Sequence, residues 1–471
     1  MRRRYLVAAL ALVAGVGLSS PVVAQAPSRE ELLTAMSAKI ACSAVFITGR
    51  EVEDALTNSA PRFWGSFTRE RITRVEVDRQ ARAVHLTLDG SLRRTARVFG
   101  DQGCVILPRG RDSVAFSPLP VRTVLGPAAS APWPMGDRPI DGPFPADVNR
   151  ARLDAGLDLA FRSPEALTLA MVVVHRGRIV AERYAPGVDQ DTQLESWSMG
   201  KSIIAALVGL LVQERKLRLD DRAPIEEWQS PGDPRARITI RDLMQMSSGL
   251  RFSDATDPAE TWGQAHPDHL YIYSGAVDAF AFSIGKQPEH PPATVGRYRN
   301  VDPLTLGGIV RRTLSAAGEE YLTWPQRALF DRIGIRRQVL ETDPYGNFLL
   351  TGYDYGTARN WARLGMLYLQ DGVWQGQRLL PEGWSRFVST PGPAWKEPVY
   401  GGLFRLNGNG EWNMPRDAYF MSGGGVSKTI VIPSHDLVIV RMGHLQGTRK
   451  HEADLNLALG EILAAIPQRG E

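Results

Sequence analysis

The distribution of hydrophobic and polar residues indicates a small β-rich region near the amino terminus. Between residues 71 and 107, short apolar runs alternate with charged residues and are separated by turn signals such as Asp89-Gly90. A period of two is typical of strands with one exposed face. A helix is predicted before these strands, over Arg29 to Lys39, and the apolar run Ser43 to Thr48 is interpreted as a further strand.

The rest of the chain predicts a second, larger unit. Leu167 to Val174 and Ile179 to Tyr184 form a predicted β-hairpin, and a long apolar helix follows from Ser198. Strands return late, and they are followed by an amphipathic helix. With strands at both ends and helices between them, we expect an α+β fold, an α/β sandwich of one antiparallel sheet flanked by helices beside a mostly helical lobe. The late strands are predicted over residues 402–406, 418–422, 429–432 and 437–442, and the last helix over 453–466.

The first residues have the layout of a secretory signal peptide. Three arginines precede an apolar stretch, and small residues end in Ala24, with Ala26 as a second possible cleavage point. The apolar run is shorter than the roughly 20 residues that a membrane span needs. We therefore expect a periplasmic or secreted protein without a stable membrane anchor. The predicted division is a signal peptide over 1–24, a β-rich module over 25–116, a Pro/Gly-rich linker over 117–148 and a main domain over 149–471.

Composition and charge exclude several classes of function. The 471 residues are 43% hydrophobic and 23% charged, as in an ordinary soluble globular protein. Removal of the signal peptide takes away three arginines and no acids, so the formal charge falls from +4 to 4 − 3 = +1. No basic stripe is present, so nucleic acid is not an expected partner. No zinc, Walker or dinucleotide-binding motif is present, so neither a metal nor another cofactor is expected. The sequence does not set the oligomeric state.

The two cysteines, Cys42 and Cys104, both lie in the predicted β-rich module. An even number of cysteines in an exported protein favours a disulfide. Closing a loop of this length stabilises the fold by about 4 kcal/mol in the chain-entropy description. The alternative is a pair of buried free thiols.

The start of the apolar helix carries the strongest candidate chemistry. Ser198 and Lys201 are three residues apart and therefore share one helix face. The helix field at this end favours a developing anion, and apolar surroundings lower the pKa of a lysine. A serine nucleophile and its base thus lie on one helical turn. The alternative is an ordinary helix cap with a solvated lysine.

Two later segments add candidate binding groups. Tyr298 and Asn300 lie just before an apolar helix. The Tyr298 phenol could relay protons there, and the Asn300 amide could hold a substrate carbonyl. Ser422, Gly423 and Gly424 lie between two predicted strands, where glycines let a backbone approach a substrate closely and donate N–H groups to an oxyanion. The alternatives are a packing tyrosine and a flexible turn.

A competing motif overlaps the serine. Ser196-x-Ser198-x-Gly200 is similar to the nucleophile elbow of α/β-hydrolases, which needs a strand running into the serine. Residues 187–193 are too polar for such a strand, so this interpretation is rejected.

The order of these segments resembles that of class C β-lactamases, family VIII esterases and related penicillin-binding proteins. Ser198-Met199-Gly200-Lys201, Tyr298-Arg299-Asn300 and the late glycine segment carry the resemblance. Other stretches are similar to the nylon-oligomer (6-aminohexanoate-dimer) hydrolase branch. The similarity spans roughly residues 165–465, and the stretches of that branch are 238–250, 341–347, 358–365 and 380–384.

The resemblance implies a serine acyl-enzyme mechanism acting on a small amide or ester. Ser198 would attack a carbonyl, Lys201 and Tyr298 would move the proton, and the N–H groups of Ser198 and Gly424 would form the oxyanion hole. Ser422 and Gly423 would contact the substrate together with Asn300.

The sequence also departs from this family. Met421-Ser422-Gly423 stands where a β-lactamase has Lys-Thr-Gly, and Lys428-Thr429 is interpreted as a chance match because Ile430 follows it. The lost lysine is the natural partner of a substrate carboxylate, so strong β-lactamase activity is not expected. The alternatives are a penicillin-binding-like peptidase or weak β-lactamase, and a binding or sensor protein that has lost turnover.

Overall fold

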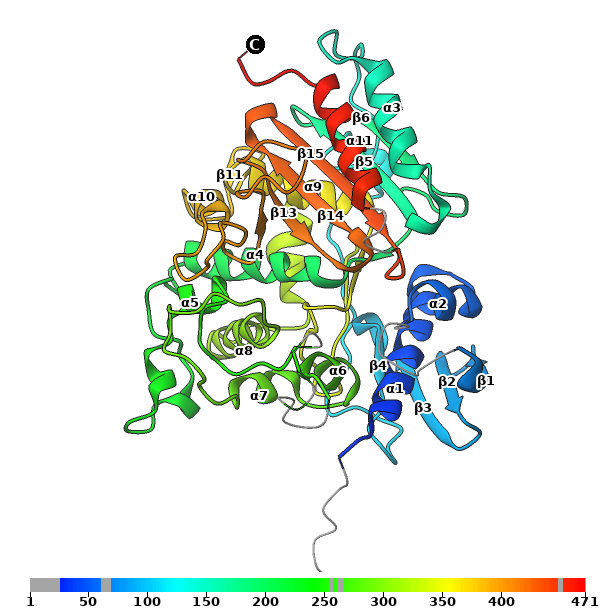
Figure 1. Cartoon of the computed structure of the whole chain (residues 1–471), viewed down its shortest axis with the longest axis vertical. Coiled ribbons are helices and arrows are strands. Elements are labelled where there is room, and N and C mark those ends of the chain that lie inside the picture. Colours follow the sequence, from blue (N-terminus) through cyan, green and yellow to red (C-terminus); the bar gives the residue numbers. More distant parts are fainter. Residues whose placement is uncertain are drawn as a thin grey trace, which may run out of the picture.

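The computed structural model describes residues 26–60, 69–254, 257–258, 260, 266–447 and 452–470. The predicted signal peptide, residues 1–24, lies outside the described residues. Figure 1 shows a large unit with a central sheet and a smaller unit beside it. The helices are α1 Arg29–Ser43, α2 Val52–Asn58, α3 Arg150–Phe161, α4 Gly200–Gln213, α5 Ile240–Met244, α6 Asp268–Ser274, α7 Ala279–Ile284, α8 Val301–Ala316, α9 Ala358–Leu369, α10 Trp384–Ser389 and α11 Glu452–Ala465.

The strands form separate antiparallel sheets. The small unit has the order β1-β2-β3-β4, and the large sheet has the order β12-β13-β14-β15-β5-β6. A third, short sheet has the order β7-β9-β8, and β10 pairs with β11. The strands are β1 Ile72–Asp78, β2 Ala83–Leu88, β3 Leu92–Val98, β4 Cys104–Ile106, β5 Thr168–His175, β6 Arg178–Tyr184, β7 Leu194–Glu195, β8 Val339–Leu340, β9 Asp354–Gly356, β10 Val373–Trp374, β11 Gln377–Arg378, β12 Arg405–Leu406, β13 Tyr419–Ser422, β14 Lys428–Ile432 and β15 Leu437–Gly443.

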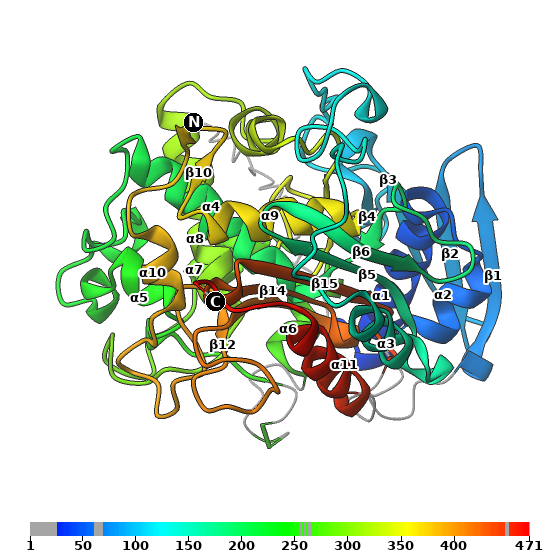
Figure 2. The same ribbon diagram turned by 90° about the horizontal axis from the view of Figure 1, so that it is seen from above.

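The large sheet confirms the predicted α+β architecture. Strands from the end of the chain pair with the early hairpin, because β15 lies antiparallel to β5. Every residue of β5 is buried, and its side chains alternate between two apolar clusters: Val172 belongs to one, Val173 to the other. Helices α3 and α11 lie side by side over one face, and α9 covers the other (Figure 2). A strand that reads as continuously apolar is therefore buried on both faces.

The amino-terminal strands are also confirmed, but the prediction of a strand over Ser43 to Thr48 is wrong. This segment continues α1 as a π-helical turn over Ala44–Thr48, which ends at Gly49 with φ of 82°. A short apolar run does not distinguish a strand from a buried helix end. By length and composition, Arg29–Thr48 could cross a membrane, yet 83% of its apolar window is buried inside the protein. It acts here as the core helix of the small sheet.

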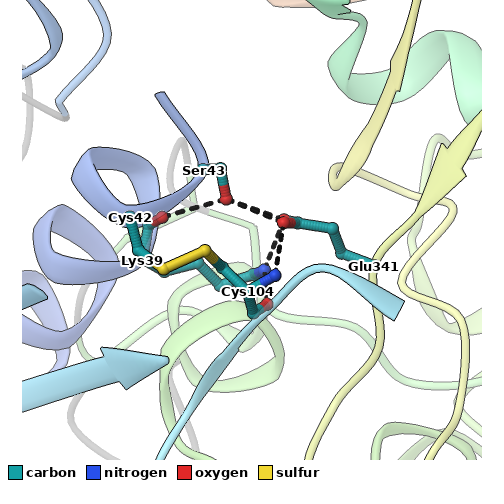
Figure 3. Close-up of a disulfide and its surroundings, with 5 residues drawn as sticks. All are labelled: Lys39, Cys42, Ser43, Cys104 and Glu341. Atoms are coloured by element: carbon teal, nitrogen blue, oxygen red, sulfur yellow. Dashed lines mark hydrogen bonds and ion pairs between the residues drawn. A yellow bond between two sulfur atoms is a disulfide. The ribbon is translucent and has the colours of Figure 1, made fainter. Parts of the chain in front are cut away.

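A buried polar cluster joins the small unit to the large one (Figure 3). The Cys42–Cys104 disulfide, with a Cα–Cα distance of 6.1 Å, is present and links α1 to β4. Lys39 Nζ lies 2.5 Å from Glu341 Oε2, and this carboxylate also accepts hydrogen bonds from the Ser43 hydroxyl at 2.9 Å and the Cys104 N–H at 2.7 Å. Glu341 belongs to the large unit, so the two units share one buried ion pair.

Candidate active site

Ser198 lies in a 3-10 turn that leads directly into α4. Pairing of β7 with β9 brings Ser196, the residue before this turn, beside Asp354. The Ser196 N–H and hydroxyl both donate to the Asp354 carbonyl, at 3.2 and 2.8 Å, and the hydroxyl also contacts the carboxylate. A Cβ on Gly200 would lie 2.4 Å from Asp354 Oδ1, so α4 begins against Asp354 with no room for a side chain.

The structure brings Ser198 and Lys201 together as predicted from their spacing. Lys201 Nζ lies 2.8 Å from Ser198 Oγ. The Thr351 carbonyl accepts a hydrogen bond from each, at 3.2 Å from Nζ and 3.3 Å from Oγ. Lys201 is only 1% exposed and forms no ion pair with a carboxylate in the described part of the chain. The alternative of a solvated lysine is therefore wrong.

Tyr298 completes this group. Lys201 Nζ lies 4.8 Å from the centre of its ring. Burial alone would raise the pKa of the Tyr298 phenol, but the charge of Lys201 and hydrogen bonds with Lys201 and Ser198 outweigh it and lower this pKa. Burial lowers the pKa of Lys201, and interactions with Tyr298 oppose this only in part. Both groups therefore release a proton more readily than a solvated lysine or tyrosine does.

Asn300 lies behind these groups. Its side chain is 1% exposed, and its amide donates a hydrogen bond to the Tyr273 hydroxyl at 2.7 Å. That hydroxyl donates in turn to the Thr351 carbonyl at 2.6 Å. Asn300 Oδ1 has no hydrogen-bond partner among the described residues. The predicted contact of Asn300 with substrate stays a prediction, and the amide is placed to hold Tyr273 against Thr351.

The glycine segment after β13 packs tightly against the serine turn. A Cβ on Gly423 would lie 2.0 Å from the Ser196 carbonyl, and one on Gly424 would lie 3.2 Å from the Trp197 ring. The Gly423 N–H donates to the Ser427 carbonyl at 2.8 Å. These contacts explain the glycines by close approach. The predicted oxyanion role of Gly424 remains a prediction.

A cavity of about 180 Å³ opens on Ser198. It contains five of the predicted site residues but neither Asn300 nor Gly424. A larger cavity of about 630 Å³, whose lining includes Arg50 and His444, lies elsewhere and does not contact Ser198. The cavity that opens on Ser198 is lined by Ser198, Lys201, Tyr298, Tyr400, Leu403, Arg405, Ser422 and Gly423.

Three residues near the site are not identified by sequence reasoning. Thr351 acts through its main-chain carbonyl, which leaves no signal in a side-chain pattern. Asp354 is fully buried, and burial raises its pKa to about 7 although Ser196 and Gln338 oppose this by hydrogen bonding. Arg405 reaches the cavity from β12, far from any recognised motif.

The fold agrees with the comparisons to known proteins. Residues 157–464 match the family described as Beta-lactamase, and the chain belongs to this family of serine hydrolases.

The chain is also similar to individual proteins. The chain is 25% identical over 241 residues to a 6-aminohexanoate-dimer hydrolase of Paenarthrobacter ureafaciens, and the match covers 50% of this chain and 60% of that enzyme. A solved penicillin-binding protein homologue from Caulobacter crescentus superposes with a TM-score of 0.52 at 17% identity, covering 68% of this chain and 99% of the other. A solved family VIII carboxylesterase superposes with a TM-score of 0.51 at 13% identity, covering 68% of this chain and 99% of the other. At these identities the two structures show the shared fold alone.

Proposed function

We propose that this protein is an exported serine hydrolase that cleaves small amides or esters through an acyl-enzyme on Ser198. The observation that carries the proposal is the 2.8 Å contact between Lys201 Nζ and Ser198 Oγ beside an open cavity. A buried amine without a carboxylate partner favours its neutral form, which can accept the serine proton. The named activities of the relatives, amide and ester hydrolysis, support the substrate class.

The proposed reaction has two halves. Ser198 Oγ attacks the substrate carbonyl carbon while its proton passes to Lys201 Nζ, and a tetrahedral oxyanion forms. The N–H groups of Ser198 and Gly424 stabilise that oxyanion. The proton then passes through Tyr298 to the leaving amine or alcohol as its bond to carbon breaks. Water attacks the resulting ester by the reverse proton route, which releases the acid and restores Ser198.

A fluorophosphonate probe tests the nucleophile. The intact mass of the wild type should increase by one adduct, and Ser198→Ala should show none. Ser202→Ala is the matched control, because Ser202 lies on the same helix, is buried and donates its hydroxyl to the Leu403 carbonyl. It should retain the adduct. A folded wild type without any adduct would reject the proposal in favour of a binding or sensor protein.

Export is a separate part of the proposal. The apolar amino-terminal stretch and the disulfide support it. Fractionation of expressing bacteria, with amino-terminal sequencing of the product, should find the protein outside the cytoplasm and beginning close after Ala24. An intact amino terminus on a cytoplasmic product would contradict export without affecting the proposed chemistry.

A further inference from the structure

Arg405 is the cavity residue that the proposed mechanism does not use. Its guanidinium lies 4.9 Å from the centre of the Tyr298 ring and 5.5 Å from that of Tyr400. It forms no ion pair and no side-chain hydrogen bond within the part of the chain that the structure describes. A guanidinium presents donors in a planar fork that matches a carboxylate, and a buried or half-buried arginine is ordinarily paired.

A second cation lies behind the same wall of the cavity. Lys428 on β14 is paired in register with Ser422, and its Nζ donates to Ser422 Oγ at 3.4 Å. Its ammonium is buried over the rings of Trp412 and Phe420, at 4.4 and 5.0 Å from their centres. Because the Ser422 oxygen accepts from Lys428, its own hydroxyl proton is left to donate into the cavity.

Among the described residues, no acidic side chain lines this cavity. Its polar wall therefore combines a guanidinium with a hydroxyl donor, and the buried Lys428 ammonium lies behind them. Glu411 and Glu452 partly offset the Lys428 charge, but neither lines the cavity. Such a wall favours an anion, and low exposure strengthens each contact. The carboxylate partner that the sequence lacks at the end of β13 is thus supplied by the neighbouring strands β12 and β14.

We infer that Arg405 and Ser422 form a carboxylate-binding subsite, so that the preferred substrates are amides or esters that carry a free carboxylate close to the scissile carbonyl. This inference rests on the proposed function and specifies its substrate class. Lys428 orients Ser422 and contributes positive charge from behind, without touching the substrate.

Matched ester pairs test the subsite on both sides of the scissile bond. The mono-4-nitrophenyl ester of glutaric acid is compared with 4-nitrophenyl valerate, and 4-acetoxybenzoate with its methyl ester. Wild type should show a higher kcat/KM for at least one carboxylate than for its neutral partner, after correction for spontaneous hydrolysis. Arg405→Gln should lower kcat/KM for that carboxylate by about 10- to 100-fold, as expected for a charge-assisted bidentate contact. The neutral partner should change by no more than about threefold at the plateau of the pH profile.

Two further variants separate binding from other roles of Arg405. Arg405→Lys keeps the charge but loses the fork, and should fall between wild type and Arg405→Gln. Arg312→Gln is the control, because Arg312 lies on the surface of α8 in an exposed pair with Glu227. This variant should have the wild-type kcat/KM for both the charged and the neutral ester.

The outcomes also separate this inference from the proposed function. Equal losses for charged and neutral esters would overturn the subsite and assign Arg405 to tuning Tyr298 and Lys201. A wild type without preference for either carboxylate would overturn it as well. In both cases the fluorophosphonate adduct on Ser198 would still support the hydrolase. Absence of that adduct would reject the hydrolase itself.

Discussion

Two buried lysines, one at the junction of the two units and one in the cavity, differ in whether a carboxylate is their partner. Lys39 and Lys201 are each 1% exposed, and burial lowers the pKa of both. Lys39 has the Glu341 carboxylate at 2.5 Å. Lys201 instead faces the Ser198 hydroxyl and the Thr351 carbonyl. Burial alone therefore does not make a lysine a base. A lysine paired with a carboxylate holds two units together, and one without a carboxylate beside a hydroxyl can accept its proton.

The largest effect is expected from removing the unpaired lysine. Lys201→Met should lower kcat/KM for 4-nitrophenyl esters by about 10²- to 10⁴-fold, the usual contribution of a positioned base. The melting temperature should stay level or rise, because no buried charge loses its partner. Steady-state kinetics and thermal unfolding check both statements. A variant that keeps a tenth of wild-type activity would remove Lys201 from the role of base.

Removing the paired lysine should instead lower stability and leave activity nearly unchanged. Lys39→Met leaves Glu341 buried beside Ser43 and the Cys104 N–H only, and should cost about 3–5 kcal/mol of unfolding free energy. Activity per folded molecule should stay within about threefold of wild type. Urea unfolding measures the loss, and Lys39→Met combined with Glu341→Gln should recover part of it.

An exposed pair provides the control for this result. Arg312→Met removes a surface partner of Glu227 and should cost at most about 1 kcal/mol. If Lys39→Met were equally mild, the buried pair would not be the structural connection described above.

The disulfide should matter to the junction and not to the cavity. Cys42→Ser with Cys104→Ser removes a link across 62 residues, and should cost about 2–4 kcal/mol. Thermal unfolding of this variant should match that of reduced wild type. Its kcat/KM at 25 °C should equal that of the oxidised protein. A fully folded variant with tenfold lower activity would instead show that the junction influences the cavity, and would weaken the contrast between the two lysines.

Sequence reasoning predicts much of this molecule because its main signals are local. Alternation gives the small sheet, and a continuous apolar run gives β5, which is buried on both faces. The spacing of Ser198 and Lys201 gives their contact, since both lie on one helical turn. The error over Ser43 to Thr48 has a local cause too, because so short an apolar run does not separate a helix end from a strand.

What the sequence does not predict depends on distant residues or on the main chain. Lys39 and Glu341 are 302 positions apart, and no pattern links them. The Thr351 carbonyl carries no side-chain signal. Arg405 reaches the cavity only because β12 pairs with β13. Lys428, interpreted as a chance match, lies against Ser422 through strand register.

The smallest expected effect is a shift in the pH dependence of kcat/KM, which reports the protonation state of Lys201. Because Lys201 must be neutral to accept the serine proton, kcat/KM should rise about tenfold per pH unit from the acid side and level off above the apparent pKa. That pKa should lie below the ordinary lysine value of 10.5, since burial lowers it. Lys201 and Tyr298 share protons, so the observed pKa belongs to the pair.

The positive charge of Arg405 predicts the direction in which this pH profile shifts when Arg405 is replaced. Burial is the main cause of the lowered pKa of Lys201, and Arg405 lowers it further by repulsion; Arg405 also lowers the pKa of Tyr298. Arg405→Gln should therefore shift the rising limb for a neutral ester to higher pH, whereas Arg405→Lys should leave it near its wild-type position. Profiles of kcat/KM between pH 5 and 10 measure the shift. A rising limb that moves to lower pH in Arg405→Gln, or that persists unchanged in Lys201→Met, would show that another group is the base. Lys201 would then have no more catalytic role than Lys39.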